Sequence, residues 1–257
     1  MTETTPFPEL AQQYLGEVSS RVRQLAAQAE TGAFDAAIDL MVGAIHAGGV
    51  IQAFGTGHSE AFAMEIAGRA GGLIPTNKIA LRDVVVRGSQ DVGMLSGSEL
   101  ERNPAIVDEL FDISPVGPDD LFIIASNSGV NGSIVGLALR AKATGHKVIA
   151  VTSMAHTMRV APKHPSGKRL YEIADVVLDN LAPFGDATLE LAGGVPVGAV
   201  SSMTAAFIAQ LLTIGTAARI AATGVTPPLY ISANIPGGDE HNRALEDLYR
   251  DKIRRSA

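Results

Sequence analysis

The chain has 257 residues, of which 46% are hydrophobic, and its formal net charge at pH 7 is -7. This length suits one large α/β domain, and the sequence contains no low-complexity linker and no repeat at a fixed period. The negative charge without a Lys/Arg block argues against nucleic-acid and anionic-membrane partners, and the absence of cysteine excludes disulfides, thiolate nucleophiles and cysteine-bound zinc.

The first ten residues, MTETTPFPEL, have neither a basic stretch nor the apolar segment of a signal peptide. No continuous run reaches the roughly 18 apolar residues of a membrane span. We therefore expect a soluble cytoplasmic protein whose partners are small molecules or its own copies.

Apolar residues recur every three or four positions between residues 8 and 29, which predicts an amphipathic helix of roughly 20 residues. A second helix is predicted over about 34–46. Four apolar runs then indicate strands, with helical stretches such as 135–145 between them; the runs are VIQAF (50–54), LFIIAS (121–126), KVIAVTS (147–153) and ADVVLDN (174–180). This alternation is typical of a parallel sheet covered by helices on both faces.

Two more helices are predicted near the end of the chain. The alanine-rich stretch 198–223 predicts a buried helix, and 239–253 predicts a closing amphipathic helix. The expected organisation is a single domain over 1–257, with an N-terminal helix in 1–33, a core in 34–225 and a C-terminal loop and helix in 226–257.

Two strand-to-helix turns, FGTGHSE (54–60) and SNSGVNGS (126–133), carry most of the functional signal. In a parallel sheet, ligands bind outside the carboxyl ends of the strands, where both turns lie. Each turn offers hydroxyl groups, glycines that permit close backbone approach, and free N–H groups at a helix start, which together suit a phosphate monoester. The plainer alternative is a pair of ordinary turns with helix-capping serines.

The first turn matches a dinucleotide-binding loop poorly. Glu60 stands where the third glycine of that loop belongs, and its carboxylate would repel a pyrophosphate. A second serine-rich loop has no role in that fold. The HPSGKR stretch (164–169) also lacks the first glycine of a nucleotide-binding P-loop. A sugar phosphate therefore explains the two turns better than a nucleotide does.

Both turns and their flanks resemble the two halves of a sugar isomerase (SIS) domain; the matching segments are GTGHSEAFAMEIAGRAG (55–71) and DLFIIASNSGVNGSIVGLALRAKATGHKVIAVTS (120–153). The resemblance covers roughly residues 34 to 225. It implies a flavodoxin-like three-layer αβα sandwich around a five-stranded parallel sheet, with extra helices at both ends. It also implies a phosphosugar ligand, no cofactor, and active sites shared within a homodimer or homotetramer.

By position, the resemblance assigns substrate and phosphate binding to the two turns. The residues are Gly57, His58 and Ser59 in the first turn, and Ser126, Asn127, Ser128, Gly129 and Asn131 in the second. Members of the family often have Thr or Ser in place of Asn131. SIS folds also serve as sensors without chemistry, so the fold alone does not define the function.

The whole chain looks most like stand-alone bacterial SIS proteins that are similar to N-acetylmuramic acid 6-phosphate etherases. The supporting stretches are GSELERN (97–103), AVSSMTAAF (199–207) and ANIPGGDEHN (233–242). That group implies dehydration of an N-acetylamino-sugar phosphate, such as N-acetylglucosamine 6-phosphate. An aldose-ketose isomerase and a phosphosugar sensor are the alternatives, although residues 1–45 contain no basic recognition helix of the kind a DNA-binding sensor carries.

Elimination and isomerisation both begin when a carboxylate removes the proton on carbon 2, and several glutamates are candidates for this base. Glu60 follows the phosphate serine, and Glu65 shares a helix face with Arg69, so that a surface ion pair is the alternative role for Glu65. Glu99 and Glu101 lie in a charged segment that can equally be solvated. The resemblance favours Glu99.

His241 is the candidate acid. The two glycines of GGDEHN (237–242) predict that Asp239 begins a helix, and a histidine in that first turn is biased toward its neutral form, able to transfer protons near pH 7. Related SIS enzymes bring a C-terminal histidine to the sugar ring, often from the neighbouring subunit, which implies a role in ring opening or in protonating the leaving oxygen. The alternative is a capping Asp239 beside a surface histidine. We predict no metal site, because Glu65 with His241 lacks a supporting motif.

Overall fold

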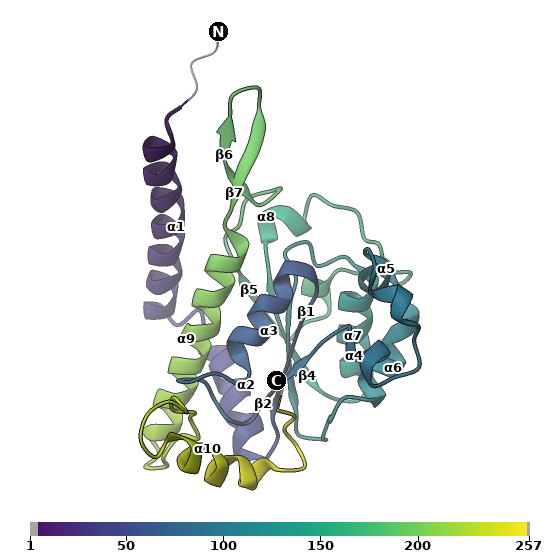
Figure 1. Cartoon of the computed structure of the whole chain (residues 1–257), viewed down its shortest axis with the longest axis vertical. Coiled ribbons are helices and arrows are strands. Elements are labelled where there is room, and N and C mark those ends of the chain that lie inside the picture. The colour runs from purple at the N-terminus through teal and green to yellow at the C-terminus, as the bar shows by residue number, and fades with distance from the viewer. Residues whose placement is uncertain (1–4, 256–257) are drawn as a thin grey trace.

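A five-stranded parallel sheet forms the centre of the computed structural model, which describes residues 5–255. Its strand order is β2-β1-β3-β4-β5 (Figure 1), and every pairing is parallel. The strands are β1 (Ile51–Gly55), β2 (Thr76–Ile79), β3 (Leu121–Ala125), β4 (Lys147–Thr152) and β5 (Val176–Asp179). This is the flavodoxin-like order, in which the direction of winding reverses between β1 and β3. The expected three-layer α/β fold is confirmed.

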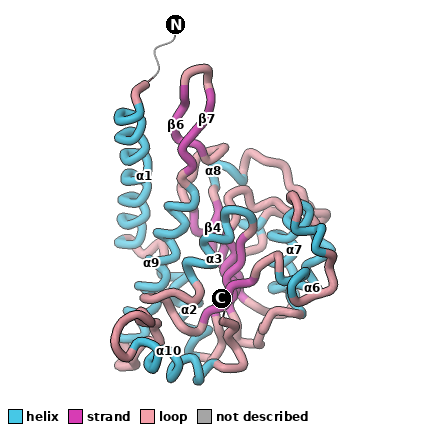
Figure 2. Tube along the Cα trace, viewed as in Figure 1, coloured by secondary structure: helices cyan, strands magenta, loops and turns pink. Residues whose placement is uncertain are grey.

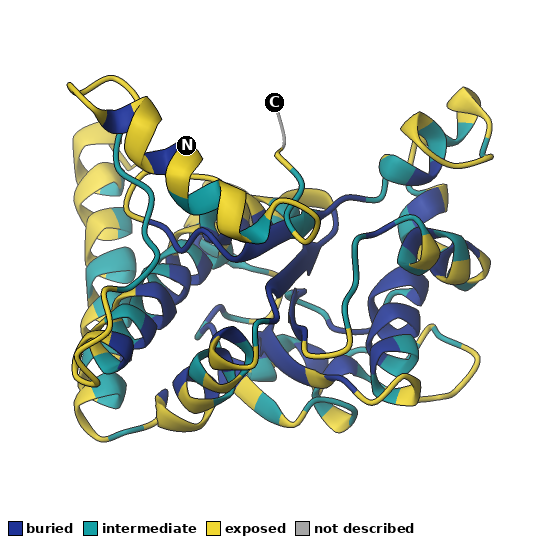
Figure 3. Ribbon diagram, turned by 90° about the horizontal axis from the view of Figure 1, so that it is seen from below, coloured by how far each residue is buried: buried dark blue, intermediate teal, exposed yellow. Residues whose placement is uncertain are grey.

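Helices cover both faces of the sheet, because alternate side chains of each strand point to opposite sides. Ile51 and Ala53 face one layer, which contains α1 (Phe7–Glu30), α2 (Asp35–His46), α3 (Glu60–Ile66) and α9 (Ser201–Ala221). Phe54 and Phe122 face the other layer, which contains α4 (Asp83–Val86), α5 (Glu99–Arg102), α6 (Val107–Asp112) and α7 (Gly132–Ala143). The sheet is therefore buried between two helical layers (Figure 3), which explains the apolar strand sequences.

Strand β2 is the sheet strand that the apolar pattern does not reveal. Three of the four residues in its sequence, TNKI, are polar, and the polar groups are used at the edge of the sheet. The Asn77 side chain donates to the Lys252 carbonyl (2.7 Å) and accepts from the Arg254 N–H (2.6 Å). The C-terminal segment thus covers this edge, which protects it from pairing with another chain.

An antiparallel hairpin of β6 (Ala187–Leu191) and β7 (Val195–Ala199) extends from the carboxyl end of the sheet beside α1 (Figures 1 and 2). The Tyr14 hydroxyl of α1 donates to the Ala199 carbonyl over 2.6 Å. This hairpin was not expected from the sequence. It separates β5 from α9 and so determines where α9 begins.

The remaining elements are α8 (Met154–Thr157), α10 (Gly238–Glu246) and short 3-10 helices at Gly57–Ser59, Val92–Leu95, Pro104–Ile106, Leu170–Glu172 and Asp247–Tyr249. The closing helix ends at Glu246, earlier than the predicted 253, and continues as a 3-10 turn. The ends of the predicted domain, residues 1–4 and 256–257, lie outside the described residues.

Helix α9 is long and apolar enough to span a membrane by length and composition alone. In the fold, 44% of its most apolar window is buried, and Ile208 and Leu212 belong to the core that α9 shares with α2 and α3. A core helix of a soluble protein meets the same criteria. The serine, threonine and glutamine residues spaced along α9 explain why the sequence shows no unbroken apolar run.

Candidate functional site

The loop after β1 closes tightly over the end of its strand. A Cβ atom on Gly55 would lie 2.1 Å from the Ser59 carbonyl oxygen, so only glycine permits this close approach. The short 3-10 turn Gly57–Ser59 follows and leads directly into α3. The turn places His58 and Ser59 beyond the carboxyl end of the sheet.

The loop after β3 is held by its own side chains and by the next strand. Ser126 Oγ accepts from the Gly129 N–H over 3.1 Å, and Ser126 is almost fully buried. The Asn127 carbonyl accepts from the Ser153 N–H (3.2 Å), while Asn127 Oδ1 accepts from Asn180 Nδ2 (3.1 Å). These bonds fix the loop before any ligand binds.

A small pocket lies between the two loops at the point where the sheet reverses its winding, the usual ligand position in such folds. Residues predicted to bind the sugar phosphate line this pocket from both loops: His58 and Ser59 from the first, Ser126 and Asn127 from the second. Gly57, Ser128, Gly129 and Asn131 belong to the same loops but do not line this pocket; its other lining residues are Phe62, Ala125, Val151, Asn180, Ser201, Ser202 and Ala205.

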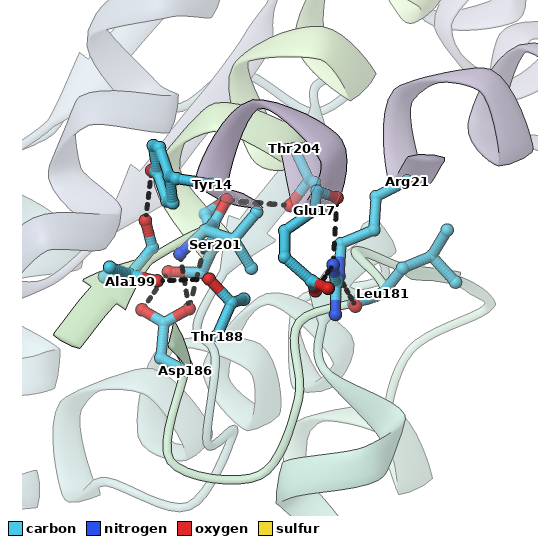
Figure 4. A network of polar contacts seen from close by, with 11 residues as sticks. Tyr14, Glu17, Arg21, Leu181, Asp186, Thr188, Ala199, Ser201 and Thr204 are labelled. Carbon is cyan, nitrogen blue, oxygen red and sulfur yellow. Dashed lines mark hydrogen bonds and ion pairs between the residues drawn. The ribbon is translucent and has the colours of Figure 1, made fainter. Parts of the chain in front are cut away.

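The start of α9 completes the pocket. Asp186, which precedes β6, accepts from the Ser201 N–H (2.8 Å) and from the Ser201 hydroxyl (2.7 Å), as Figure 4 shows. Ser201 and Ser202 therefore sit in the first turn of a 21-residue helix, whose positive end faces the pocket. These serines lie in AVSSMTAAF, a stretch that carries the family resemblance, and a serine pair before a buried helix is in addition a helix-start signal.

Glu101 is the carboxylate that binds the second loop and points toward the first. Its Oε1 accepts from the Asn131 side chain, and its Oε2 lies 3.7 Å from where a Cβ on Gly57 would stand. The Ser133 hydroxyl donates to the Glu101 carbonyl over 2.8 Å, which ties α5 to the start of α7. Asn131 Oδ1 is buried and has no hydrogen-bond partner among residues 5–255. A polar ligand bound beside the Glu101 carboxylate would supply the hydrogen bond that Asn131 Oδ1 lacks.

Glu99, which the resemblance favours, takes a different position. Its side chain is exposed, whereas Leu100 between the two glutamates is buried in the core. Within residues 5–255, no hydrogen bond or ion pair is formed by its carboxylate. The packing of Leu100 therefore directs Glu101 toward the loops and leaves Glu99 in solvent. Its assignment as the base stays a prediction.

Glu60 lies beside Ser59 but is engaged by cations. Its Oε1 is 3.1 Å from Lys78 Nζ and 3.6 Å from Arg82 Nη1. Lys78 comes from β2, and its side chain is only 8% exposed. The carboxylate is thus held toward the β2 edge of the sheet.

Glu65 forms the ion pair with Arg69 that its spacing indicates, and it also accepts from Gln210 Nε2 of α9 over 2.6 Å. Phe62 and Ile66 on the opposite face of α3 are buried, as the helical pattern predicts. Glu65 does not line the pocket between the loops. Its proposed role as a base requires that it leave these two partners.

His241 lies at the other end of the sheet from the serine loops of its own chain. The expected helix start is present, with Asp239 in the first turn of α10, and His241 Nε2 donates to the Leu229 carbonyl over 3.0 Å. Leu229 pairs with Leu73, just before β2 begins. Because the five strands of the central sheet are parallel, the start of β2 marks the amino end of this sheet. A site that combines His241 with the serine loops therefore requires a second copy.

Among residues 5–255, no group of three or more His, Asp and Glu side chains is placed to hold a metal ion. His146 has a structural setting: its Nε2 bonds to the Gly117 carbonyl (2.9 Å), and its ring packs edge-on against Phe122.

His156 lies at the base of the β6–β7 hairpin, and its protonation should make the stability of the protein depend on pH. Burial lowers its pKa, against the attraction of Asp186, and its Nδ1 accepts from the Gly185 N–H over 3.0 Å. If the His156 ring were protonated, Nδ1 would carry a hydrogen and could no longer accept from the Gly185 N–H. The unfolded chain therefore takes up a proton at the ordinary histidine pKa of about 6.5, where the folded chain does not.

The free energy of unfolding should consequently fall as the pH drops below about 6.5 toward the lower pKa of the folded state. Urea unfolding at about pH 7.5 and pH 5.5 measures this change. His156→Gln should reduce the pH dependence, whereas His46→Gln, at an exposed position, should not. Equal pH dependence in wild type and His156→Gln would contradict this role.

Comparison with known proteins identifies the family. Residues 13–153, from α1 through β4 and including both loops, match the family described as SIS domain. The chain belongs to the SIS domain family. Its relatives include a protein of Geobacillus thermodenitrificans named UPF0309 protein, which is 34% identical over 94% of this chain and 95% of its own. A Listeria monocytogenes protein of the same name is 40% identical over 84% of this chain and 88% of its own.

Solved SIS structures share the architecture. A phosphoheptose isomerase from Francisella tularensis superposes with a TM-score of 0.52 and covers 82% of this chain and 98% of its own. Its sequence identity is 18%, so the likeness shows a common fold.

Proposed function

We propose that this SIS protein dehydrates an N-acetylamino-sugar 6-phosphate, with N-acetylglucosamine 6-phosphate as the expected substrate. The observation that carries the proposal is the meeting of two serine loops and the start of α9 around one pocket, with Glu101 bonded to Asn131 of the second loop. Hydroxyl and N–H donors at helix starts suit a phosphate dianion. A carboxylate beside them suits proton removal from the sugar.

In the proposed reaction, the sugar ring first opens, because the proton on carbon 2 is acidic only while carbon 1 is a carbonyl. Glu101 then takes that proton, and the electrons of the C–H bond form an enolate. The bond from carbon 3 to its hydroxyl breaks, an acid protonates the departing oxygen, and water leaves. His241 of a second copy is the proposed acid for ring opening and water loss. Glu60, Glu65 and Glu99 are the other candidate bases.

Elimination is favoured over isomerisation by the substrate itself. An acylated nitrogen on carbon 2 cannot become the ketone of a ketose, whereas the hydroxyl on carbon 3 can leave. The fold is shared with a phosphoheptose isomerase, so an aldose-ketose isomerase is the second candidate.

Mass spectrometry after incubation with N-acetylglucosamine 6-phosphate tests the proposal. A product lighter by one water supports the dehydratase. An isobaric ketose formed only from a non-acylated sugar phosphate would overturn it in favour of the isomerase. Binding without turnover would indicate a sensor.

The serine loops should dominate phosphate affinity. We expect Ser126→Ala or Ser128→Ala to weaken binding of the sugar phosphate by about 1.5–3 kcal/mol, the usual worth of a hydrogen bond to a charged group. Calorimetric titration measures the loss. Ser166→Ala, on an exposed loop, is the matched control. Unchanged binding in both loop variants, with the fold intact, would remove the phosphate assignment.

A shared active site predicts a homodimer, or a tetramer of such dimers. Helix α1 supports this proposal, because Leu25 is its only buried residue among 7–30, while the apolar side chains of Phe7 and Leu15 are 80% and 56% exposed. Such apolar exposure along one helix is typical of a surface that a partner covers. Sedimentation at micromolar concentration should therefore show at least a dimer.

Mixing two inactive variants tests whether the site is shared. Glu101→Gln and His241→Ala should each be nearly inactive alone, because each lacks one proton-transfer group. After denaturation and refolding together, half of the dimers should be mixed, each with one intact site, so about a quarter of the wild-type activity should return. Two portions of a single variant, refolded together, provide the control. No recovery in confirmed mixed dimers would contradict a shared site.

A further inference from the structure

A cavity of about 640 Å³ lies at the amino end of the sheet, away from the serine loops. Its walls come from residues 67–70 after α3, from Thr76 at the start of β2, from 230–234, and from the C-terminal segment 253–255. Three loop segments, the start of β2 and helix α10 therefore meet around one concave space. The proposed dehydration does not use it.

The cavity is lined by three arginines, Arg69, Arg254 and Arg255, and by one acidic residue, Glu246. The Glu246 carboxylate is already engaged: its Oε1 accepts from Arg255 Nε (2.8 Å) and from the Tyr230 hydroxyl (3.0 Å). The local charge is therefore positive, although the chain as a whole is strongly acidic. We call this space the arginine cavity.

The guanidinium groups retain donors for a ligand. Arg69 binds Glu65 through Nη1, and Arg255 binds Glu246 through Nε. Within residues 5–255, no hydrogen bond is formed by Nη1 or Nη2 of Arg255, or by Nη2 of Arg69. Arg254 uses Nη2 for the Ile113 carbonyl, and its Nη1 is 3.9 Å from Asp83. Forked guanidinium donors match phosphate and carboxylate oxygens in geometry and charge.

Arg254 is partly withdrawn from solvent. Burial, and to a smaller extent the nearby Arg87, lower the pKa of Arg254, with Asp83 acting in the opposite direction. Backbone segments around Ser232 and Asn234 add polar groups to the same wall.

We propose that the arginine cavity is a second binding site, separate from the serine loops, for a small anion of the phosphate-ester class that carries two or more negative charges. Three arginines in the lining balance such a charge, and the volume accommodates a small metabolite. The site does not depend on the proposed reaction, because it shares no lining residue with the pocket between the loops.

Equilibrium dialysis with radiolabelled pyrophosphate, at low ionic strength, counts the sites per chain. The wild type should bind two pyrophosphates. Arg254→Ala/Arg255→Ala should lose one site, with affinity there at least roughly tenfold weaker, the effect expected from losing charged hydrogen bonds. Arg250→Ala removes one positive charge from the same segment without lining the cavity and should keep both sites. Arg69→Ala provides a second variant that leaves the C-terminal segment intact, and it should weaken the same site.

Two results would overturn the proposal: a single site in the wild type that Ser126→Ala/Ser128→Ala removes, or the same two sites in both cavity variants as in Arg250→Ala. Loss of one site in the cavity variants, with no effect of the serine variants, would keep this second site and refute phosphate binding by the loops. Circular dichroism and thermal unfolding confirm that each variant is folded.

Discussion

Glu101→Gln should lower kcat for loss of water by roughly 10²- to 10⁴-fold, the usual contribution of a general base. Glutamine keeps an oxygen that accepts from Asn131, so the contact between α5 and α7 should survive. What glutamine removes is the ability to take a proton. Binding of the sugar phosphate should therefore change much less than turnover.

Exchange of the carbon 2 proton in D₂O gives the sharper measurement, because it reports proton removal before water leaves. We expect Glu101→Gln to abolish this exchange. Asp108→Asn, which removes a carboxylate that is 80% exposed on the neighbouring helix α6, is the matched control and should retain it. Retained exchange in Glu101→Gln, with loss in Glu65→Gln or Glu99→Gln, would transfer the role of base to that glutamate.

Gly132→Ala should reduce both stability and activity. A Cβ on Gly132 would lie 2.1 Å from the Arg102 carbonyl oxygen, so α5 must move away from the start of α7. Overpacking of this kind typically costs about 1–3 kcal/mol in the free energy of unfolding. Because Glu101 precedes Arg102, the same movement should displace the carboxylate from Asn131 and lower kcat.

Urea unfolding and steady-state kinetics measure the two effects. Gly43→Ala provides the control, since Gly43 lies inside α2 with no heavy atom within 4 Å of its added Cβ. Alanine is the better helix former there, so Gly43→Ala should be neutral or slightly stabilising. A Gly132→Ala variant as stable and as active as wild type would show that the close contact of α5 with α7 is unimportant.

The sequence alone determined the fold class and the two loops. Strands β1, β3 and β4 are buried on both faces, so each is a continuous apolar run that is visible without neighbours. Ser126 follows β3 directly and Ser59 lies four residues after β1, so their spacing along the chain is enough to place them at the carboxyl end of the sheet. Strand β2 escaped detection because three of its four residues are polar and its partner strand β1 lies about 25 residues earlier in the chain. The hairpin escaped detection because its strands are short and largely solvent-exposed, so neither forms a buried apolar run.

Only the tertiary structure decided which charged residues lie where. Glu99 and Glu101 lie in the same charged segment of the sequence. The burial of Leu100 between them turns Glu101 toward Asn131 and leaves Glu99 in solvent. His241 occupies the expected helix start, but the pairing of Leu229 with Leu73 holds that helix at the amino end of the sheet. Ser201 reaches the pocket because Asp186, across the hairpin, fixes the start of α9. Such positions depend on contacts between segments far apart in the chain, which local patterns of residues do not encode.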